Sequence, residues 1–402
     1  MSPKLHYYNP GHETVVLEGK AHYTPSVNVC KLQKDLALLP AWYASAGDYV
    51  YVENPAHSHH FSTLPEEIRP PVALLFPDSP ELKAGNLPAM EASPWGISPQ
   101  SIHLYHQLNK KYGLNIDVPE WNDEYVRLTG RQTAAQCLQK IKSLLPDMEL
   151  PPVPLFFDDP EHIARYITAN PDSYLVKTPY SSSGRGLLWL YEGELSEKDK
   201  NWIKGAIKKQ GSVSLEPILN RWRDFALEFY SDGKGTVEYK GISMFDTNKR
   251  GAYEGNKIEC QFDSQEFFQV FIGEETFRKV KDTVALVIQD TYSSLYKGCI
   301  GVDMFLYHDR NSSIAIHPCV EINMRYTMGM LAIRIFEQYV HEKAAGIFHL
   351  IYENDPLVAY QAHLSHLQHC PPTIKDGKLK TGYIPLCPVT EETNYMAYVI
   401  VR

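Results

Sequence analysis

Residues 301–306, Gly-Val-Asp-Met-Phe-Leu, and residues 317–329, His-Pro-Cys-Val-Glu-Ile-Asn-Met-Arg-Tyr-Thr-Met-Gly, decide the fold of this chain. They predict two adjacent strands joined by a short polar turn. Glu321 and Asn323 stand two positions apart, so on a strand they point to the same face, and Arg325 continues that row. Asp303 on the first strand adds a second carboxylate. Such a row suits a hard divalent cation and phosphate far better than a hydrophobic core.

The composition is that of a globular protein with two or three compact units. The chain has 402 residues, of which 44% are hydrophobic and 22% are charged. The net charge of −9 argues against general affinity for nucleic acid or for anionic membranes. No apolar run approaches the ~20 residues that span a bilayer, and the first residues do not resemble a signal peptide. Seven scattered cysteines without a C-x-x-C pair favour a reducing cytoplasm over structural zinc or a disulfide framework.

A second chemical signal lies in residues 174–187, Tyr-Leu-Val-Lys-Thr-Pro-Tyr-Ser-Ser-Ser-Gly-Arg-Gly-Leu. Lys177 ends an apolar strand, and a buried ammonium needs a counter-charge or a shifted pKa. The loop that follows is rich in serine and glycine, whose hydroxyl and backbone N–H groups can approach an anion closely. The loop could fold over a polyphosphate, although such a turn by itself more often connects two strands. It is neither a Walker loop nor a G-x-G-x-x-G turn.

A third signal is the strand Ser214-Leu-Glu-Pro-Ile-Leu, followed by Arg221-Trp-Arg-Asp-Phe-Ala-Leu-Glu-Phe. A strand that runs into a short connector offers backbone groups for an adenine edge, and a nearby carboxylate could hold ribose hydroxyls. Taken alone, Glu216 is equally well explained as a surface acid.

The order of these pieces resembles the ATP-grasp superfamily. A strand lysine with a Ser/Gly loop, Glu-Pro-hydrophobe, Asp-Phe, Gly-x-Asp and Glu-x-Asn-x-Arg follow one another over roughly residues 150–335. In that family two α+β subdomains grip ATP between them. The resemblance therefore implies an α+β, ATP-grasp fold, here preceded by a small α/β domain. We expect residues 1–115 as this N-terminal domain, 116–210 as the lid subdomain with a helical lead-in, 211–345 as the C-terminal subdomain with the metal site, and 346–402 as a C-terminal extension.

The resemblance also implies roles for individual residues. Lys177 and Arg325 would be catalytic, contacting the nucleotide phosphates and steadying the transferred phosphoryl group. The expected nucleotide-binding residues are Lys177, the closing loop Ser181, Ser182, Ser183, Gly184, Arg185 and Gly186, the adenine hinge Glu216, Pro217 and Ile218, the ribose contact Asp224, and Lys240 on a neighbouring strand. Asp303, Glu321 and Asn323 match the family's magnesium ligands, with Glu321 bridging two Mg²⁺ ions and Mn²⁺ as an alternative metal.

The function that follows is ATP- and Mg²⁺-dependent ligation of a carboxylate, activated as an acyl phosphate, to an amine that is an amino acid or peptide-like, less readily to a thiol. Two alternatives stay open: a non-catalytic ATP-binding protein, and a kinase for a small molecule on the same fold. The expected partners are a small-molecule carboxylate and an amine, with no nucleic acid and no membrane, and a homodimer is one option for the assembly.

The N-terminal residues carry weaker signals. Tyr8-Asn-Pro-Gly-His-Glu13 is either a structural turn or part of a substrate site, and Pro94–Pro99 leaves the same choice open. His57-Ser-His-His60 is interpreted as a solvated loop. In this region we expect strands near 14–17, 48–52 and 72–76 and a helix over 99–113.

Overall fold

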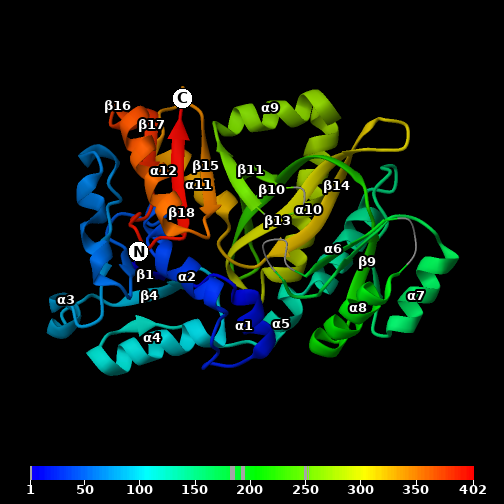
Figure 1. The fold of residues 1–402 in the computed structure, drawn as a ribbon, viewed down its shortest axis with the longest axis horizontal. Coiled ribbons are helices and arrows are strands. Elements are labelled where there is room, and N and C mark those ends of the chain that lie inside the picture. Colours follow the sequence, from blue (N-terminus) through cyan, green and yellow to red (C-terminus); the bar gives the residue numbers. More distant parts are fainter. Residues whose placement is uncertain (1, 182–185, 192–194, 249–250, 252) are drawn as a thin grey trace. The chain divides into compact units, whose positions relative to one another are not determined.

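The computed structural model describes residues 2–181, 186–191, 195–248, 251 and 253–402 (Figure 1). The chain divides into two compact units. The first comprises Met1–Asn122, Glu254–Ser264 and Arg325–Arg402, and the second Asp123–Tyr253 and Gln265–Met324. The four-part division expected from the sequence stays a prediction. The compact units group the chain differently, because residues 346–402 belong with the N-terminal residues.

The N-terminal part of the first unit is a parallel sheet in the order β3-β2-β1-β4-β5. Its strands are β1 (Lys4–Tyr7), β2 (Tyr49–Tyr51), β3 (Ala73–Leu75), β4 (Met90–Pro94) and β5 (Ile116–Asp117). Its helices are α1 (His12–Glu18), α2 (Val27–Asp35), α3 (Pro80–Ala84) and α4 (Pro99–Tyr112), with 3-10 helices η1 (Leu39–Trp42), η2 (Pro55–Thr63) and η3 (Glu66–Ile68). Leu5 and Leu75 of the sheet pack with Tyr105 and Leu108 of α4, which lies alongside β4 in Figure 1.

Three of the four elements expected here are confirmed. The strands near 48–52 and 72–76 are β2 and β3, and α4 begins at the capping box of Ser98 and Ser101. The strand near 14–17 is wrong, because these residues form α1 between Gly11 and Gly19, both in the left-handed region. A short apolar run has no readable period, so it does not distinguish a strand from a buried helix turn.

The C-terminal part of the first unit is antiparallel, in the order β12-β15-β18-β17-β16. Its strands are β12 (Tyr253–Ile258), β15 (Gly346–Tyr352), β16 (Thr373–Lys375), β17 (Lys378–Pro385) and β18 (Tyr395–Val401), and its helices are α11 (Met328–Tyr339) and α12 (Pro356–His369). The buried Ala359 of α12 packs with Tyr383 and Tyr398 of the sheet.

The solvated loop expected at residues 57–60 is also wrong. These residues lie in η2, where His57 and His60 are buried and only His59 points to solvent among the three histidines. The Nε2 atom of His60 lies 3.1 Å from the carbonyl oxygen of Pro385, its hydrogen-bond partner. That partner is distant in the sequence, so no local pattern indicated the burial.

The second unit begins with an antiparallel sheet in the order β6-β9-β7-β8. Its strands are β6 (Leu155–Phe157), β7 (Tyr174–Lys177), β8 (Leu187–Leu190) and β9 (Val213–Pro217). Helices α7 (Pro160–Ala169) and α8 (Glu197–Gln210) pack on it through Ile163, Ile167 and Ile203. The side chains of Asp159 and Ser196 cap these helices. Both are residue types that commonly satisfy the free N–H groups at a helix start.

The remaining strands of this unit have the order β14-β13-β10-β11. They are β10 (Asn220–Asp232), β11 (Val237–Thr247), β13 (Lys297–His308) and β14 (Ile314–Asn323), with helices α5 (Glu124–Thr129), α6 (Arg131–Leu144), α9 (Gln261–Ile272) and α10 (Glu274–Tyr292). Helix α10 contacts β10, β11 and β14, and buries Val280, Val284 and Val287 at helical spacing. The mixture of parallel and antiparallel sheets confirms the α+β class.

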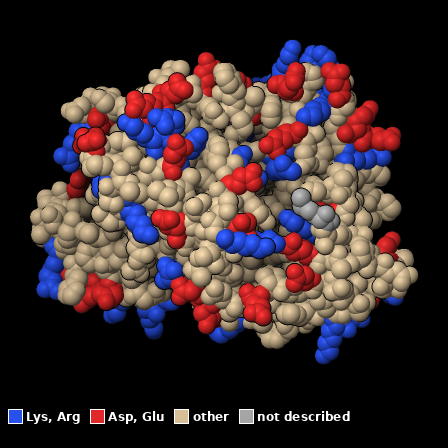
Figure 2. Space-filling model, turned by 180° about the vertical axis from the view of Figure 1, so that it is seen from behind, with Lys and Arg blue, Asp and Glu red and all other residues tan. Residues whose placement is uncertain are grey.

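The surface carries both signs of charge. On the face shown in Figure 2, acidic and basic side chains are interspersed and form no large patch of one sign. Within the described part of the chain, no helix combines the length and the apolar character needed to cross a membrane.

The buried histidine of η2 makes stability depend on pH. Burial lowers the pKa of His60 from 6.5 to about 4. Between about pH 6.5 and about pH 4, His60 therefore binds a proton in the unfolded chain but stays neutral in the folded protein. The free energy of unfolding consequently decreases as the pH falls through this range. We expect His60→Gln to remove about 3 kcal/mol of that loss. Urea unfolding followed by circular dichroism across this range measures it. His59→Gln, in the same 3-10 helix but exposed, should leave the slope of the wild type, and equal slopes for both variants would contradict the assignment.

Candidate functional site

The two predicted metal-binding strands are antiparallel neighbours whose acidic residues face each other. Asp303 on β13 is directly opposite Glu321 on β14. Gly301 is opposite Asn323 two positions further along, so Asn323 lies on the same face. Asp303 and Glu321 are half-buried, whereas both chain neighbours of Asp303 are buried. The structure thus brings the three predicted ligands to one face, and their role as metal ligands stays a prediction.

A third carboxylate, which the sequence analysis did not single out, extends this face to β10. Glu228 is opposite Gly301, in the row that contains Asn323. It is buried, and the hydroxyl of Ser243 on β11 donates a hydrogen bond to it over 3.2 Å. In the sequence Glu228 is one acid in an alternating strand, and its register against β13 depends on bulges that no local pattern reveals.

Arg131, the first residue of α6, was also missed. Its Nη2 atom lies 3.0 Å from Oε1 of Glu321 and donates to the hydroxyl of Ser181 over 3.3 Å. Its Nε atom donates to the carbonyl oxygen of Thr178 over 3.1 Å. With its side chain only 9% exposed, Arg131 ties the loop after β7 to the acidic face. An arginine at a helix start has the sequence signature of a surface charge, so only the fold reveals this connection.

Lys177 is buried at the end of β7 and forms an ion pair with Glu216 of β9. Lys177 is opposite Ser214 in the ladder, so its side chain and that of Glu216 share a face. Burial lowers the pKa of Lys177, and the carboxylate of Glu216 partly offsets this effect. The counter-charge expected for a strand lysine is therefore supplied by Glu216, whose role in an adenine hinge stays a prediction.

The predicted closing loop is described only at its two ends. Ser182, Ser183, Gly184 and Arg185 lie outside the described residues. Ser181 accepts a hydrogen bond from Arg131, and the N–H of Thr178 donates to the carbonyl oxygen of Gly186 over 2.9 Å. Gly186 has a φ of +73°, and a Cβ atom there would lie 2.2 Å from Oγ1 of Thr178. This position requires glycine, which ties the end of the loop closely to β7.

The predicted adenine hinge and ribose contact already have protein partners. Pro217 ends β9, and the N–H of Ile218 donates to the carbonyl oxygen of Ser173 over 2.9 Å. Asp224 is buried, forms an ion pair with Arg221 and accepts a hydrogen bond from Thr247 over 2.8 Å. Their roles toward a nucleotide stay predictions, since a nucleotide would have to exchange with these contacts or use other atoms.

Lys240 and Arg325 form ion pairs with residues outside this group. Lys240 on β11 is half-exposed, with its Nζ atom 2.6 Å from Oε1 of Glu238. Arg325 belongs to the first unit, where its Nε atom lies 2.6 Å from Oε1 of the buried Glu13. The sequence analysis gave no sign of this partner, which precedes Arg325 by most of the chain.

The acidic face fits Mg²⁺ in its chemistry. Asp303, Glu321 and Asn323 offer only oxygen ligands, which this hard cation prefers. Among the described residues, no three His, Cys, Asp or Glu side chains form a complete metal-binding group. Two carboxylates suffice where phosphate oxygens and water complete the octahedron, as they do for Mg²⁺ in nucleotide sites. The residues therefore fit a magnesium nucleotide better than a free metal ion.

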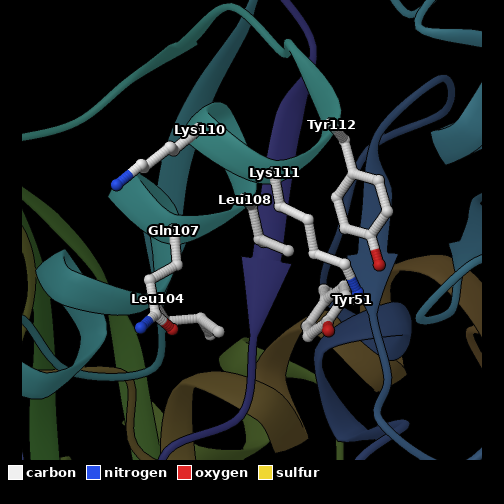
Figure 3. A pocket seen from close by; sticks show the side chains of 7 residues that line it. All are labelled: Tyr51, Leu104, Gln107, Leu108, Lys110, Lys111 and Tyr112. Atoms are coloured by element: carbon white, nitrogen blue, oxygen red, sulfur yellow. The ribbon is translucent and has the colours of Figure 1, made fainter.

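A pocket of about 550 Å³ in the first unit differs from the acidic face in the chemistry of its lining residues. Figure 3 shows Lys111 extending toward Tyr51 beside Tyr112. The Nζ atom of Lys111 lies 3.4 Å from a carboxylate oxygen of Asp78 and 4.7 Å from the ring centre of Tyr112. The lining residues are Tyr51, Leu104, Gln107, Leu108, Lys110, Lys111 and Tyr112, which include no carboxylate, histidine or cysteine. This pocket lacks the groups for metal binding.

No family model matches the chain, and no curated protein matches its sequence. Solved structures do match. A biotin carboxylase from Campylobacter jejuni has 12% identity and a TM-score of 0.52, covering 100% of this chain and 88% of that one. The biotin carboxylase domain of 2-oxoglutarate carboxylase from Hydrogenobacter thermophilus, a dimer with MgADP, ADP and bicarbonate, has 13% identity and a TM-score of 0.52, covering 100% and 86%. N5-carboxyaminoimidazole synthetase from Staphylococcus aureus, complexed with ADP, has 13% identity and a TM-score of 0.49, covering 100% and 93%.

At these identities the likeness is one of fold. The two biotin carboxylase structures span this entire chain, and both are ATP-grasp proteins. The order of the chemical motifs in the sequence points to the same architecture. The fold of this chain is therefore the ATP-grasp fold.

Proposed function

We propose that the protein is an ATP- and Mg²⁺-dependent ligase that activates a carboxylate as an acyl phosphate and joins it to an amine. The observation that carries this proposal is the cross-strand pair of Asp303 and Glu321, with the buried cations Arg131 and Lys177 in the same unit. Phosphoryl transfer requires carboxylates that hold magnesium and positively charged side chains that contact the phosphates.

The charges of the site are balanced internally and can be exchanged. Arg131 is paired with Glu321, and Lys177 with Glu216. A nucleotide would bring phosphate oxygens to both cations, and Asp303, Glu321 and Asn323 would be the residues to hold Mg²⁺, or Mn²⁺. Bound there, the metal would neutralise the charge that develops as the γ-phosphoryl group moves. The loop from Ser181 to Gly186 would exclude water from the acyl phosphate, which is readily hydrolysed.

The ligands of the neighbouring folds support this proposal. The Hydrogenobacter thermophilus structure holds MgADP, ADP and bicarbonate. By analogy we propose a small carboxylate and an amine as substrates of this protein, and a homodimer as its assembly. The seven cysteines are thiols and form no disulfide with one another, which supports a reducing compartment such as the cytoplasm.

Two other functions on the same fold make different predictions. A small-molecule kinase would leave the phosphoryl group on its substrate, whereas a ligase liberates inorganic phosphate. A non-catalytic nucleotide-binding protein would show no turnover, and the opposed Asp303 and Glu321 argue against it. Like charges directly opposite each other in a ladder are destabilising, and a cation bound between them would add to the compensation that Arg131 gives to Glu321.

The acidic face is tested by removing one negative charge at a time. We expect Glu321→Gln and Asp303→Asn to lower turnover of Mg-ATP by about 100-fold or more, because each change weakens stabilisation of the transferred phosphoryl group. The assay is release of ADP and inorganic phosphate with mixtures of carboxylates and amino acids. Glu392→Gln, a charge change at an 83% exposed side chain, is the control. Turnover by both site variants at the wild-type rate would contradict the proposal.

The tight approach at Gly186 offers a second test. In Gly186→Ala the new Cβ atom would clash with Thr178, so we expect the affinity for a non-hydrolysable ATP analogue to fall about tenfold or more. Isothermal titration calorimetry with Mg²⁺ measures this. Gly205→Ala, within α8 and with open space around its Cβ position, should keep the affinity and stabilise the fold by about 0.5–1 kcal/mol. Equal affinities for the two variants would show that the loop end does not contribute to nucleotide binding.

A further inference from the structure

Helix α12 presents an uncharged surface on a protein that is otherwise rich in charge. Its 14 residues, Pro356–His369, include no Asp, Glu, Lys or Arg. Among the helices of ten or more residues in the described part of the chain, it is alone in this respect. Charged residues make up 22% of the whole sequence. Depletion of charge is a mark of the buried centre of protein–protein interfaces.

One face of α12 is already covered by its own sheet (Figure 1). Ala359 is buried against Tyr383 of β17 and Tyr398 of β18. On the same face, the ring of His366 stacks on that of Tyr383 with 4.9 Å between the ring centres. The Nδ1 atom of His363 lies 2.8 Å from the hydroxyl oxygen of Tyr383, its hydrogen-bond partner. These contacts fix which side of the helix faces solvent.

A second side of α12 carries apolar side chains that the protein leaves exposed. Leu357, Leu364 and Leu367 are 49%, 45% and 45% exposed, and Tyr360 is partly exposed. The intervals between these four residues are three, four and three positions, which place them on one side of the helix. This is the spacing of residues that meet a second helix in a coiled coil. The four residues, named here the α12 stripe, therefore have the geometry for packing against another helix.

The α12 stripe is symmetric about its middle. Leu357 and Leu367 lie five positions on either side of Ala362, and Tyr360 and Leu364 lie two positions on either side. An antiparallel copy of α12 that crosses at Ala362 places Leu357 of one copy opposite Leu367 of the other, and Tyr360 opposite Leu364. Contacts between identical surfaces around a two-fold axis are the commonest interfaces of homo-oligomers. The symmetry of the stripe therefore favours a second copy of this chain over an unrelated helix.

The polar residues at the two ends of α12 favour the same antiparallel orientation. Asp355 is exposed and caps the N-terminus, where its side chain accepts a hydrogen bond from the N–H of Leu357 over 3.0 Å. His369, also exposed, ends the helix. Both residues lie seven positions from Ala362, so an antiparallel pair brings Asp355 of one copy to His369 of the other. A parallel pair would bring two Asp355 carboxylates together and align the two helix dipoles unfavourably.

We propose that the protein forms a two-fold dimer in which α12 of one copy packs antiparallel on α12 of the other, with the α12 stripe as the centre of the interface. This inference deepens the homodimer of the proposed function and rests on that assembly, not on the ligase reaction. A helix of 14 residues is about 21 Å long, which gives a contact at the lower end of the size range of specific interfaces. We therefore expect a reversible dimer with a dissociation constant of roughly 1–100 µM.

Sedimentation velocity of the full chain, over concentrations that span this range, tests the interface. We expect the wild type to change from monomer to dimer as its concentration rises. Leu364→Glu buries an unpaired carboxylate near the two-fold axis and should raise the dissociation constant at least tenfold. Leu286→Glu, the same change at a 47% exposed position of α10, is the matched control and should dimerise as the wild type does. Far-UV circular dichroism verifies folding, and Leu367→Gln replaces Leu364→Glu if the latter does not fold.

Mixing two weakened variants tests the antiparallel orientation. In a mixed dimer of Tyr360→Lys and Leu364→Glu, the new lysine of one copy faces the new glutamate of the other, because positions 360 and 364 are opposite each other. We expect the mixture to dimerise at least tenfold more tightly than either variant alone. A mixed dimer no tighter than the two separate ones overturns the antiparallel arrangement.

Turnover of Mg-ATP, measured on the same samples, separates this inference from the ligase function. The carboxylates and cations of the proposed site come from one chain, so Leu364→Glu should keep the wild-type rate. A wild type that stays monomeric at every concentration overturns the interface together with the homodimer, and assigns the α12 stripe to a different partner. A Leu364→Glu variant that dimerises like the wild type overturns the interface alone. A wild type that dimerises through α12 without turnover supports the interface and contradicts only the ligase function.

Discussion

Two carboxylates that face each other across one β-ladder constrain the second unit of this protein. Asp303 and Glu321 occupy directly opposite positions, where side chains come within about 5 Å and like charges repel. The fold compensates this repulsion with Arg131, whose guanidinium contacts Glu321. The same arginine holds Ser181 and the carbonyl oxygen of Thr178 at the start of the loop after β7. Charge balance on the acidic face and the position of that loop therefore depend on one side chain.

This arrangement explains how the site can be both stable and reactive. Lys177 is buried and needs an anion, which Glu216 supplies. A buried charge that loses its partner is strongly destabilising, so each cation has to exchange one anion for another when phosphate arrives. In the proposed reaction, phosphate oxygens of a bound nucleotide would supply those anions, and Asp303 and Glu321 would then be the residues to hold Mg²⁺.

The sequence could predict the parts of this site that depend on local patterns. The two-residue spacing of Glu321 and Asn323, the lysine at the end of an apolar strand and the polar turn between the two metal-site strands are all visible within a few residues. Arg131 and Glu228 could not be found in this way, because their positions follow from strand register and helix placement across distant segments. The strand predicted near residues 14–17 was wrong for a related reason. The hydrophobic run there is too short to show a period, so its surroundings in the fold decide whether it forms a strand or a helix.

The first unit shows the same limit. The turn from Tyr8 to Glu13 has two local explanations, a structural turn or part of a substrate site, and its role stays a prediction. The fold brings Gly96 to Asn9 and Arg325 to Glu13. Glu13 and Arg325 are separated by most of the chain, so their pairing has no sequence signal.

The most direct measurement of the central claim is metal binding at the opposed carboxylates. Electron paramagnetic resonance detects Mn²⁺ bound to the protein in the presence of a non-hydrolysable ATP analogue. The account predicts protein-bound Mn²⁺ that depends on the nucleotide in the wild type, and its loss in a variant with both Asp303→Asn and Glu321→Gln. Nucleotide-dependent Mn²⁺ binding of the same affinity in that variant would contradict the account.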